Sequence, residues 1–182
     1  MEFARVIKGY DHLWAVYDPS KEYDELTSLF EMWNNADELR KFFEQNLQDL
    51  EEYEGVTDIA EAIEYTFDDA EYLEKMITEF PFTENLDEIF KPLGITDGYA
   101  AELPREKARR WDAMHPSCWL RVYGIKLDSN VYIVTGGAIK LTRKMQDREH
   151  TRKELEKLNA CKNFLQQQGV FDKESFLDFK NN

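Results

Sequence analysis

The chain has 182 residues, of which 42% are hydrophobic and 14% aromatic, and its formal net charge is −14. This composition excludes a disordered chain, which would hold far fewer aromatic residues, and no apolar run reaches the roughly 20 residues of a membrane span. The only two cysteines, Cys118 and Cys161, are more typical of small core residues than of a disulfide or a metal pair. We therefore expect one cytoplasmic α+β domain over residues 1–182, with no membrane contact.

The charge is divided unevenly along the chain. Residues 1–102 hold 27 acidic and 7 basic residues, whereas residues 103–163 hold 14 basic and 7 acidic ones. Acidic residues on the outer faces of amphipathic helices explain most of the first part. The basic part coincides with predicted strands and their loops, and an asymmetry of this kind indicates what sort of partner a protein binds.

Helices dominate the prediction for the acidic part, after an N-terminal hairpin of strands 3–8 and 12–17 around Gly9. Apolar residues at helical spacing and the capping residues Asn35 and Asp58 predict three longer helices, the third either continuous or broken near Thr66–Asp68. Two short helices are expected to follow. The five predicted helices cover 19–35, 35–53, 56–80, 83–94 and 104–111.

The basic part is predicted to contain strands followed by two helices. Strands are predicted over 118–127, 130–137 and 138–142, with Gly136-Gly137 marking a bend or bulge, and together they suggest an antiparallel sheet. A long helix over 150–169 follows, with a capping box of Thr151 and Glu154, His150 in the turn before it, and Gly169 at its end. A last short helix covers 173–179.

No strong catalytic signature is present in the sequence. It has no glycine-rich phosphate loop, no nucleophile elbow and no cysteine–histidine cluster at metal spacing. The three histidines, His12, His115 and His150, fall in separate segments. We expect neither a metal nor another cofactor.

One group of residues stands out from this background. Alternation along a strand places Trp119, Arg121, Tyr123 and Ile125 on one face, and Lys140 lies opposite Ile139 and Leu141. If the Tyr123 and Lys140 faces coincide, the sheet carries a cationic patch that can bind a phosphate backbone or stabilise a phosphoryl transition state. The alternative is that Arg121 and Lys140 form ion pairs with acids of the N-terminal helices.

The segment "WLRVYGIKLDSNVYIVTGGAIKLTRKMQDREHTRKELEKL" resembles the C-terminal part of the RelE/HigB-like toxin superfamily, in its phage-derived branch. An arginine-bearing strand, a turn, an apolar strand, a short strand ending in lysine and threonine, and a helix occur in the order of that family. The resemblance covers about residues 118–160. The rest of the chain departs from it, because the family members are compact and basic, whereas this chain is nearly twice their minimal length and has an acidic N-terminal half.

The resemblance implies a RelE-like core and, in active members, ribosome-dependent cleavage of mRNA without a metal. It also implies a cognate antitoxin as a partner. By position, Arg121, Lys140 and Arg143 would be catalytic, with Tyr123 as a proton donor or stacking partner. Lys144, Arg148 and Arg152 would bind RNA.

Two other functions remain open from the sequence. The chain can be a non-enzymatic interaction protein that has a toxin-like fold and binds a basic partner through its acidic helices. It can also be an acidic mimic of nucleic acid, with carboxylates spaced like phosphates along one face.

Overall fold

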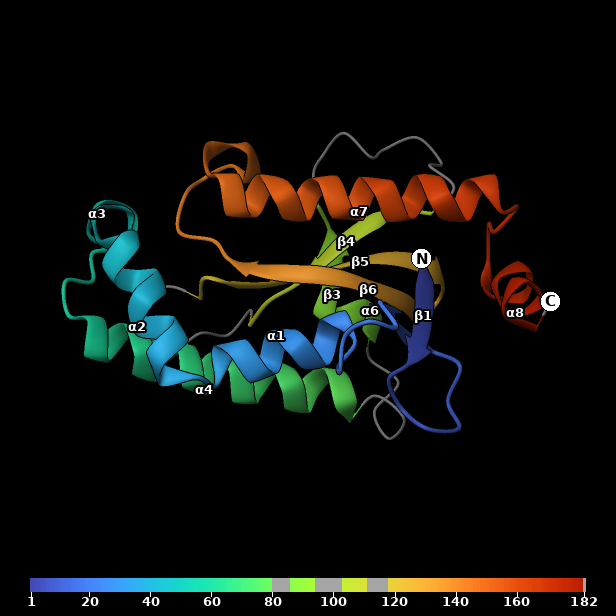
Figure 1. Cartoon of the computed structure of the whole chain (residues 1–182), viewed down its shortest axis with the longest axis horizontal. Coiled ribbons are helices and arrows are strands. Elements are labelled where there is room, and N and C mark those ends of the chain that lie inside the picture. The colour runs from blue at the N-terminus through green and yellow to red at the C-terminus, as the bar shows by residue number, and fades with distance from the viewer. Residues whose placement is uncertain (80–85, 94–102, 111–117, 182) are drawn as a thin grey trace.

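The computed structural model describes residues 1–79, 86–93, 103–110 and 118–181, and its architecture is α+β, as the sequence predicts (Figure 1). A six-stranded sheet has the order β1-β2-β6-β5-β4-β3. Its strands are β1 Glu2–Arg5, β2 Leu13–Tyr17, β3 Phe90–Pro92, β4 Arg105–Ala108, β5 Leu120–Asp128 and β6 Val131–Ile139.

The sheet is mixed, which corrects the expectation of an antiparallel one. Leu13 to Ala15 of β2 pair in parallel with Tyr132 to Val134 of β6, and the other neighbouring strands are antiparallel. A parallel pair needs a long connection, and the helices between β2 and β6 supply one. The predicted N-terminal hairpin is confirmed as β1 and β2.

Helices cover both faces of the sheet (Figure 1). On one side lie α1 Glu25–Trp33, α2 Ala36–Gln45 and α4 Ile59–Thr78, and on the other lies α7 Glu149–Gln167. Two hydrophobic clusters correspond to these two faces, the first around Trp33 and Trp119 and the second around Phe176. The shorter helical segments are α3 Leu47–Asp49, η1 Leu50–Glu54, α6 Leu86–Ile89, η3 Met145–Asp147 and α8 Lys173–Asn181.

Two of the long helices of the N-terminal part, α2 and α4, begin at the predicted caps Asn35 and Asp58, whereas α1 begins at Glu25 rather than at residue 19. Side-chain oxygens of Asp24, Asn35 and Asp58 accept backbone N–H bonds at the starts of α1, α2 and α4. Such caps satisfy donors that a helix start otherwise leaves unpaired. Helix α4 runs for 20 residues without the break considered near Thr66–Asp68. No helix within the described ranges is long and apolar enough to cross a membrane.

The helix predicted over 104–111 is wrong, because residues 105–108 form strand β4. Burial alternates along it: Glu106 and Ala108 are buried and Arg105 and Lys107 are only partly covered. Hydrogen bonding to β3 on one side and β5 on the other outweighs the helical propensity of this short segment. The neighbouring prediction, 83–94, also yields a strand, β3, after the single turn of α6; residues 83–85 and 94 lie outside the described ranges.

Gly136 and Gly137 lie within one continuous strand, β6, rather than between two strands. The register against β5 shifts between Gly136 and Val134, so the expected bulge is present. A Cβ on Gly137 would lie 2.5 Å from the carbonyl oxygen of Arg121, so only glycine lets the two strands approach here.

The start of α7 also differs from the prediction. The helix begins at Glu149, so His150 lies in its first turn rather than before it. Thr151 does not form a capping box, because its hydroxyl donates to the carbonyl oxygens of Met145 and Arg148. The predicted end is confirmed, since Gly169 has φ +75° just beyond the last turn.

Candidate anion-binding site

Strands β4 and β5 and the residue that follows β6 bring basic side chains together on the α7 side of the sheet. Lys107 is paired with Tyr123 and Arg121 with Ala138, and the backbone N–H of Lys140 donates to Trp119. Residues with the same orientation on neighbouring strands share a face. The predicted coincidence of the Tyr123 and Lys140 faces is therefore confirmed.

Trp119 was expected on the same face and lies on the other. It precedes β5, packs against Phe43 with ring centroids 5.7 Å apart, and donates from Nε1 to Thr66 Oγ1 at 3.0 Å. The alternation rule fails here because Trp119 is outside the strand.

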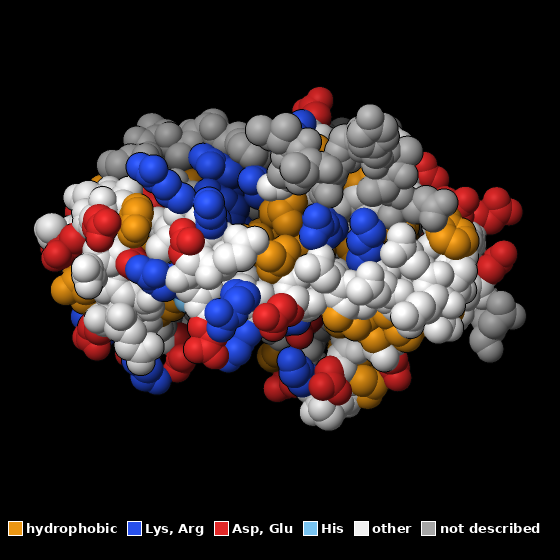
Figure 2. All heavy atoms as spheres, turned by 90° about the horizontal axis from the view of Figure 1, so that it is seen from above, with side chains coloured by type: hydrophobic (Ala, Val, Ile, Leu, Met, Phe, Trp, Pro, Cys, Tyr) orange, Lys and Arg blue, Asp and Glu red, His pale blue; other side chains and the backbone are white. Residues whose placement is uncertain are grey.

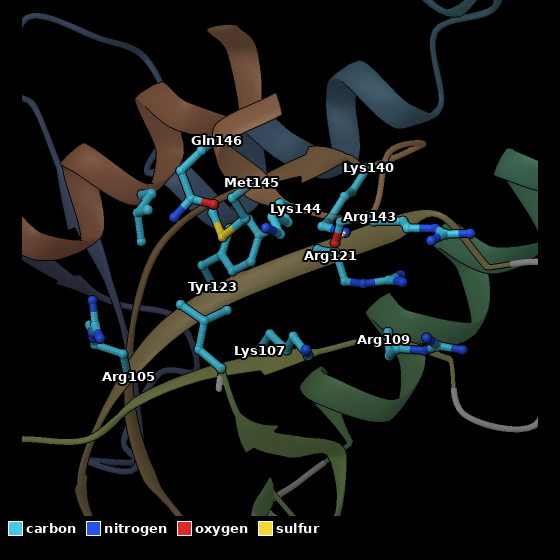
Figure 3. A pocket seen from close by; sticks show the side chains of 12 residues that line it. Arg105, Lys107, Arg109, Arg121, Tyr123, Lys140, Arg143, Lys144, Met145 and Gln146 are labelled. Atoms are coloured by element: carbon cyan, nitrogen blue, oxygen red, sulfur yellow. Dashed lines mark hydrogen bonds between the residues drawn. The ribbon is translucent and has the colours of Figure 1, made fainter. Parts of the chain in front are cut away.

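These side chains line a pocket of about 480 Å³, which we call the basic pocket. Among the described residues that line it, seven are basic and none is acidic. Figure 3 shows Lys107, Arg109, Arg121, Lys140 and Arg143 gathered on one side of it. Figure 2 looks onto the α7 side of the molecule and shows Lys and Arg side chains close together on it. The lining consists of Leu93, Arg105, Lys107, Arg109, Arg121, Tyr123, Lys140, Arg143, Lys144, Met145, Gln146 and Leu155.

Three of the cations are half-buried and repel one another. Burial lowers the pKa of Lys107, and the charges of Arg121 and Arg109 lower it further. Burial likewise lowers the pKa of Lys140, with contributions from Arg121 and Lys107. The pKa of Arg121 is lowered by burial and then by Arg109. A site of this kind gains free energy when an anion enters, because the anion offsets both the repulsion and the lost hydration.

Arg121 and Lys140 direct hydrogen bonds to carbonyl oxygens rather than to acids. Nη1 of Arg121 donates to Cys118 at 2.6 Å and to Leu120 at 2.7 Å, and Nζ of Lys140 donates to Thr142 and Arg143. Within the described ranges neither residue has an ion pair with a carboxylate. Within those ranges the alternative that they pair with acids of the N-terminal helices is therefore wrong, and the charge of Glu54 only opposes the lowering of their pKa values.

Tyr123 contributes a hydroxyl group at the pocket wall. Its side chain is fully buried, and in the part of the chain that the structure describes its hydroxyl oxygen has no hydrogen-bond partner. Burial raises the pKa of this phenol well above its usual range. The group is therefore a neutral donor that an acceptor in the pocket could satisfy, and its buried ring leaves little surface for stacking.

The remaining predicted residues divide into two groups. Arg143 and Lys144 are exposed and line the basic pocket. Arg148 and Arg152 do not line it: Arg148 binds the carboxylate of Asp49 through two bonds of 2.6 Å, and Arg152 lies 3.9 Å from Glu156. One of the predicted RNA-binding residues, Arg148, is therefore paired with a carboxylate of the acidic half.

Sequence reasoning missed Arg105, Lys107 and Arg109. These residues were assigned to a helix, in which they would not line up with Arg121. The basic residues at every second position of "REKAR" were the available signal, since the intervening Glu106 and Ala108 are the buried members. Arg105 lies at the other side of the pocket, where it donates to Asn159 Oδ1 at 2.7 Å (Figure 3).

Metal ligands do not cluster in the described ranges, which contain no group of three His, Cys, Asp or Glu residues arranged to hold an ion. The Nε2 atom of His150 is 2.9 Å from the carbonyl oxygen of Ile139, and His115 lies outside the described residues. The basic pocket can thus bind an anion through nitrogen and hydroxyl donors. Comparisons with protein-family models, curated proteins and solved structures gave no match for this chain.

Proposed function

We propose that this protein acts on RNA and that the basic pocket binds the phosphate groups of the strand. The observation that carries the proposal is the convergence of cations from β4, from β5 and from the segment after β6 on one open surface, where no described lining residue is acidic. Phosphate contacts supply most of the affinity of proteins for nucleic acid when the base sequence is not read. The resemblance to RelE/HigB-like toxins points to the same substrate class.

The chemistry suited to this pocket is strand cleavage by the RNA itself. The 2′-oxygen attacks the adjacent phosphorus and its proton passes to a base, while the bond to the 5′-oxygen breaks and that oxygen takes up a proton. The products are a 2′,3′-cyclic phosphate and a 5′-hydroxyl end. Arg121, Lys140 and Arg143 would stabilise the negative phosphoryl oxygens.

Lys107 fits the role of the base better than Lys140 does. Both pKa values are lowered, first by burial. The ammonium of Lys140 donates to two carbonyl oxygens, which favours its charged form, whereas no described residue accepts a hydrogen bond from Lys107. Tyr123 would donate a hydrogen bond, because its raised pKa makes it a weak acid.

RNA binding is tested with the purified full chain and a single-stranded 5′-hydroxyl oligonucleotide, by fluorescence anisotropy over a range of salt. The logarithm of the affinity should fall linearly with the logarithm of the salt concentration, by about 0.7 for each phosphate contacted. Lys144→Gln should reduce that slope by about one such step, because Lys144 is an exposed lysine of the basic pocket. Lys153→Gln is the matched control, because Lys153 lies outside the basic pocket and pairs with Glu149 at 2.7 Å. An oligonucleotide that does not bind at low salt rejects the proposal.

Cleavage is tested by adding the protein to translating ribosomes and mapping mRNA ends, and by measuring growth of cells that express it. Lys140→Ala and Lys107→Gln should both abolish the cleaved ends, and Lys153→Gln should not. If the intact protein leaves mRNA and growth unchanged, the cleavage step is rejected even where binding holds. A cognate antitoxin would then have no activity to suppress.

A second candidate is a non-enzymatic protein whose acidic helices bind a basic partner. It is favoured by the exposed carboxylates of α4, which recur at helical spacing at Glu61, Glu64, Asp68 and Glu71. This candidate predicts a stable complex with a basic protein that survives Lys140→Ala and is lost when Glu64 and Asp68 become Gln and Asn. The RNA proposal predicts the opposite dependence.

A further inference from the structure

The innermost cations of the basic pocket lie close enough for each to disturb the others. Each of Lys107, Arg121 and Lys140 is half-buried, and each has a pKa that burial lowers and that another cation of the pocket lowers further. A phosphodiester inside a strand brings one negative charge to such a group. A phosphate monoester brings between 1.5 and 2 at neutral pH. The monoester therefore offsets more of the repulsion.

The available hydrogen-bond donors of the basic pocket also favour a phosphate monoester. Both hydrogen bonds of the Arg121 guanidinium within the described ranges come from Nη1, so Nε and Nη2 have no hydrogen-bond partner there. Lys107 has all its donors available there, and the Tyr123 hydroxyl lacks an acceptor. A monoester has three terminal oxygens that accept such bonds, whereas a phosphodiester has two non-bridging ones.

The pocket is larger than phosphate alone requires, and part of its wall is apolar. Its volume of about 480 Å³ falls within the range of sites for small organic ligands. Met145 and Gln146 lie on the side away from the inner cations (Figure 3), and Leu93 and Leu155 also line the pocket. Apolar side chains beside the amide of Gln146 and the guanidinium of Arg105 suit a flat, partly polar ring.

We propose that the basic pocket binds a terminal phosphate monoester carried on a nucleotide-sized body, in preference to an internal phosphodiester. Lys107, Arg121 and Lys140 hold the phosphate with the Tyr123 hydroxyl, and the side formed by Met145 and Gln146 receives the body. The ligand is either a free mononucleotide or the phosphorylated end of an RNA strand. The inference rests on the proposed function in taking the basic pocket as the site of RNA contact.

Calorimetry on the full-length protein tests the phosphate class. Adenosine 5′-monophosphate should bind at least tenfold more tightly than the dinucleoside monophosphate ApA, which has only an internal phosphodiester, and adenosine should not bind. Equal affinity for the monophosphate and ApA, or binding of adenosine, overturns the inference. Inorganic phosphate should bind more weakly than adenosine 5′-monophosphate. Equal affinity of the two would mean that the adenosine part makes no contribution to binding.

The two sources of the phosphate are distinguished with one oligonucleotide prepared with a 5′-phosphate and with a 5′-hydroxyl. A phosphorylated end as ligand predicts at least tenfold tighter binding of the 5′-phosphate form. A free mononucleotide as ligand predicts no difference between the two strands while the monophosphate still binds. The absence of a preference in both the mononucleotide and the strand comparisons rejects the inference.

Tyr123→Phe separates a binding role from a structural one. Since the hydroxyl has no described partner, the variant should be at least as stable as the parent, yet it should bind the monophosphate about tenfold less tightly. Unchanged affinity removes Tyr123 from the site. Lys107→Gln should lower affinity by at least tenfold, and Lys153→Gln should leave it unchanged.

Failure of this inference can be told from failure of the proposed function. If the 5′-hydroxyl strand binds with the expected salt dependence but monoesters show no preference, only the inference fails. If the monophosphate binds and the 5′-hydroxyl strand does not, the pocket is a small-molecule site and the proposed action on RNA fails.

Discussion

Replacing Lys157 with Met should destabilise the protein, because this lysine neutralises two carboxylates from different helices. Its Nζ lies 2.7 Å from Glu25 of α1 and 3.2 Å from Glu154 of α7. The carboxylate side chains are 17% exposed and the lysine is 39% exposed. Breaking a buried pair costs about 3–5 kcal/mol and breaking an exposed one about 0–1 kcal/mol, so we expect about 2 kcal/mol here. For a chain of this size that corresponds to a fall in Tm of about 4–8 °C.

The loss should depend on pH in a defined direction. Burial opposes the charged form of Glu25, but its bonds to Lys157 and Lys21 outweigh this and lower its pKa from the ordinary 4.5. Its contribution to stability is therefore complete above pH 4.5 and is lost as the pH falls through the lowered value. The pKa of Lys157 is raised despite burial, so its contribution is present below the ordinary 10.5. Burial raises the pKa of Glu154, which makes that group costly as the pH rises above 4.5.

Urea denaturation of the parent and of Lys157→Met at about pH 7.5 and pH 4 measures the effect. We expect the difference in unfolding free energy to be largest at the higher pH and to shrink at the lower one, where the carboxylates take up protons. Lys153→Met is the control, since Lys153 and Glu149 are 64% and 67% exposed and should contribute little. Equal stability of Lys157→Met and the parent at about pH 7.5 would refute the reasoning, as would a deficit that does not change with pH.

The other predictions concern close packing and thiol reactivity. Gly137→Ala should cost about 3 kcal/mol, because its Cβ would meet the backbone oxygen of Arg121 at 2.5 Å; Gly55→Ala, which has open space but φ +67°, should cost only about 1 kcal/mol, as denaturation curves would show. Equal losses of unfolding free energy for the two variants would mean that strands β5 and β6 move apart enough to accept a Cβ at position 137. Burial raises the pKa of Cys118 to about 11 and of Cys161 to about 12, so neither thiol should react with an aromatic disulfide reagent at about pH 8 until urea unfolds the chain. Rapid labelling of the native protein would contradict that burial.

Elements governed by neighbours in the sequence were predictable. The helix starts at Asn35 and Asp58 depend on side chains that bond to the backbone two or three residues away, and the end at Gly169 depends on one left-handed residue. The apolar strands around residues 120–139 were identified in the same way. The predicted cationic group of Arg121, Tyr123, Lys140, Arg143 and Lys144 also meets in one pocket.

Elements governed by distant partners were not predictable from a single sequence. Residues 105–108 carry a helix-like composition, and only pairing with β3 and β5 makes them a strand. That strand brings Lys107 beside Tyr123 and so gives the basic pocket cations that the sequence did not reveal. Arg148 had the charge expected of an RNA contact, but its position across from Asp49 uses that charge within the protein.

The sequence by itself determined the caps at Asn35 and Asp58, the helix end at Gly169 and the apolar strands, because each depends on residues within a turn or on a two-residue alternation. The tertiary structure decided the parallel β2–β6 pair, strand β4 and the membership of the basic pocket. Hydrogen bonding between strands and repulsion between cations act across space, and their partners lie tens of residues apart along the chain.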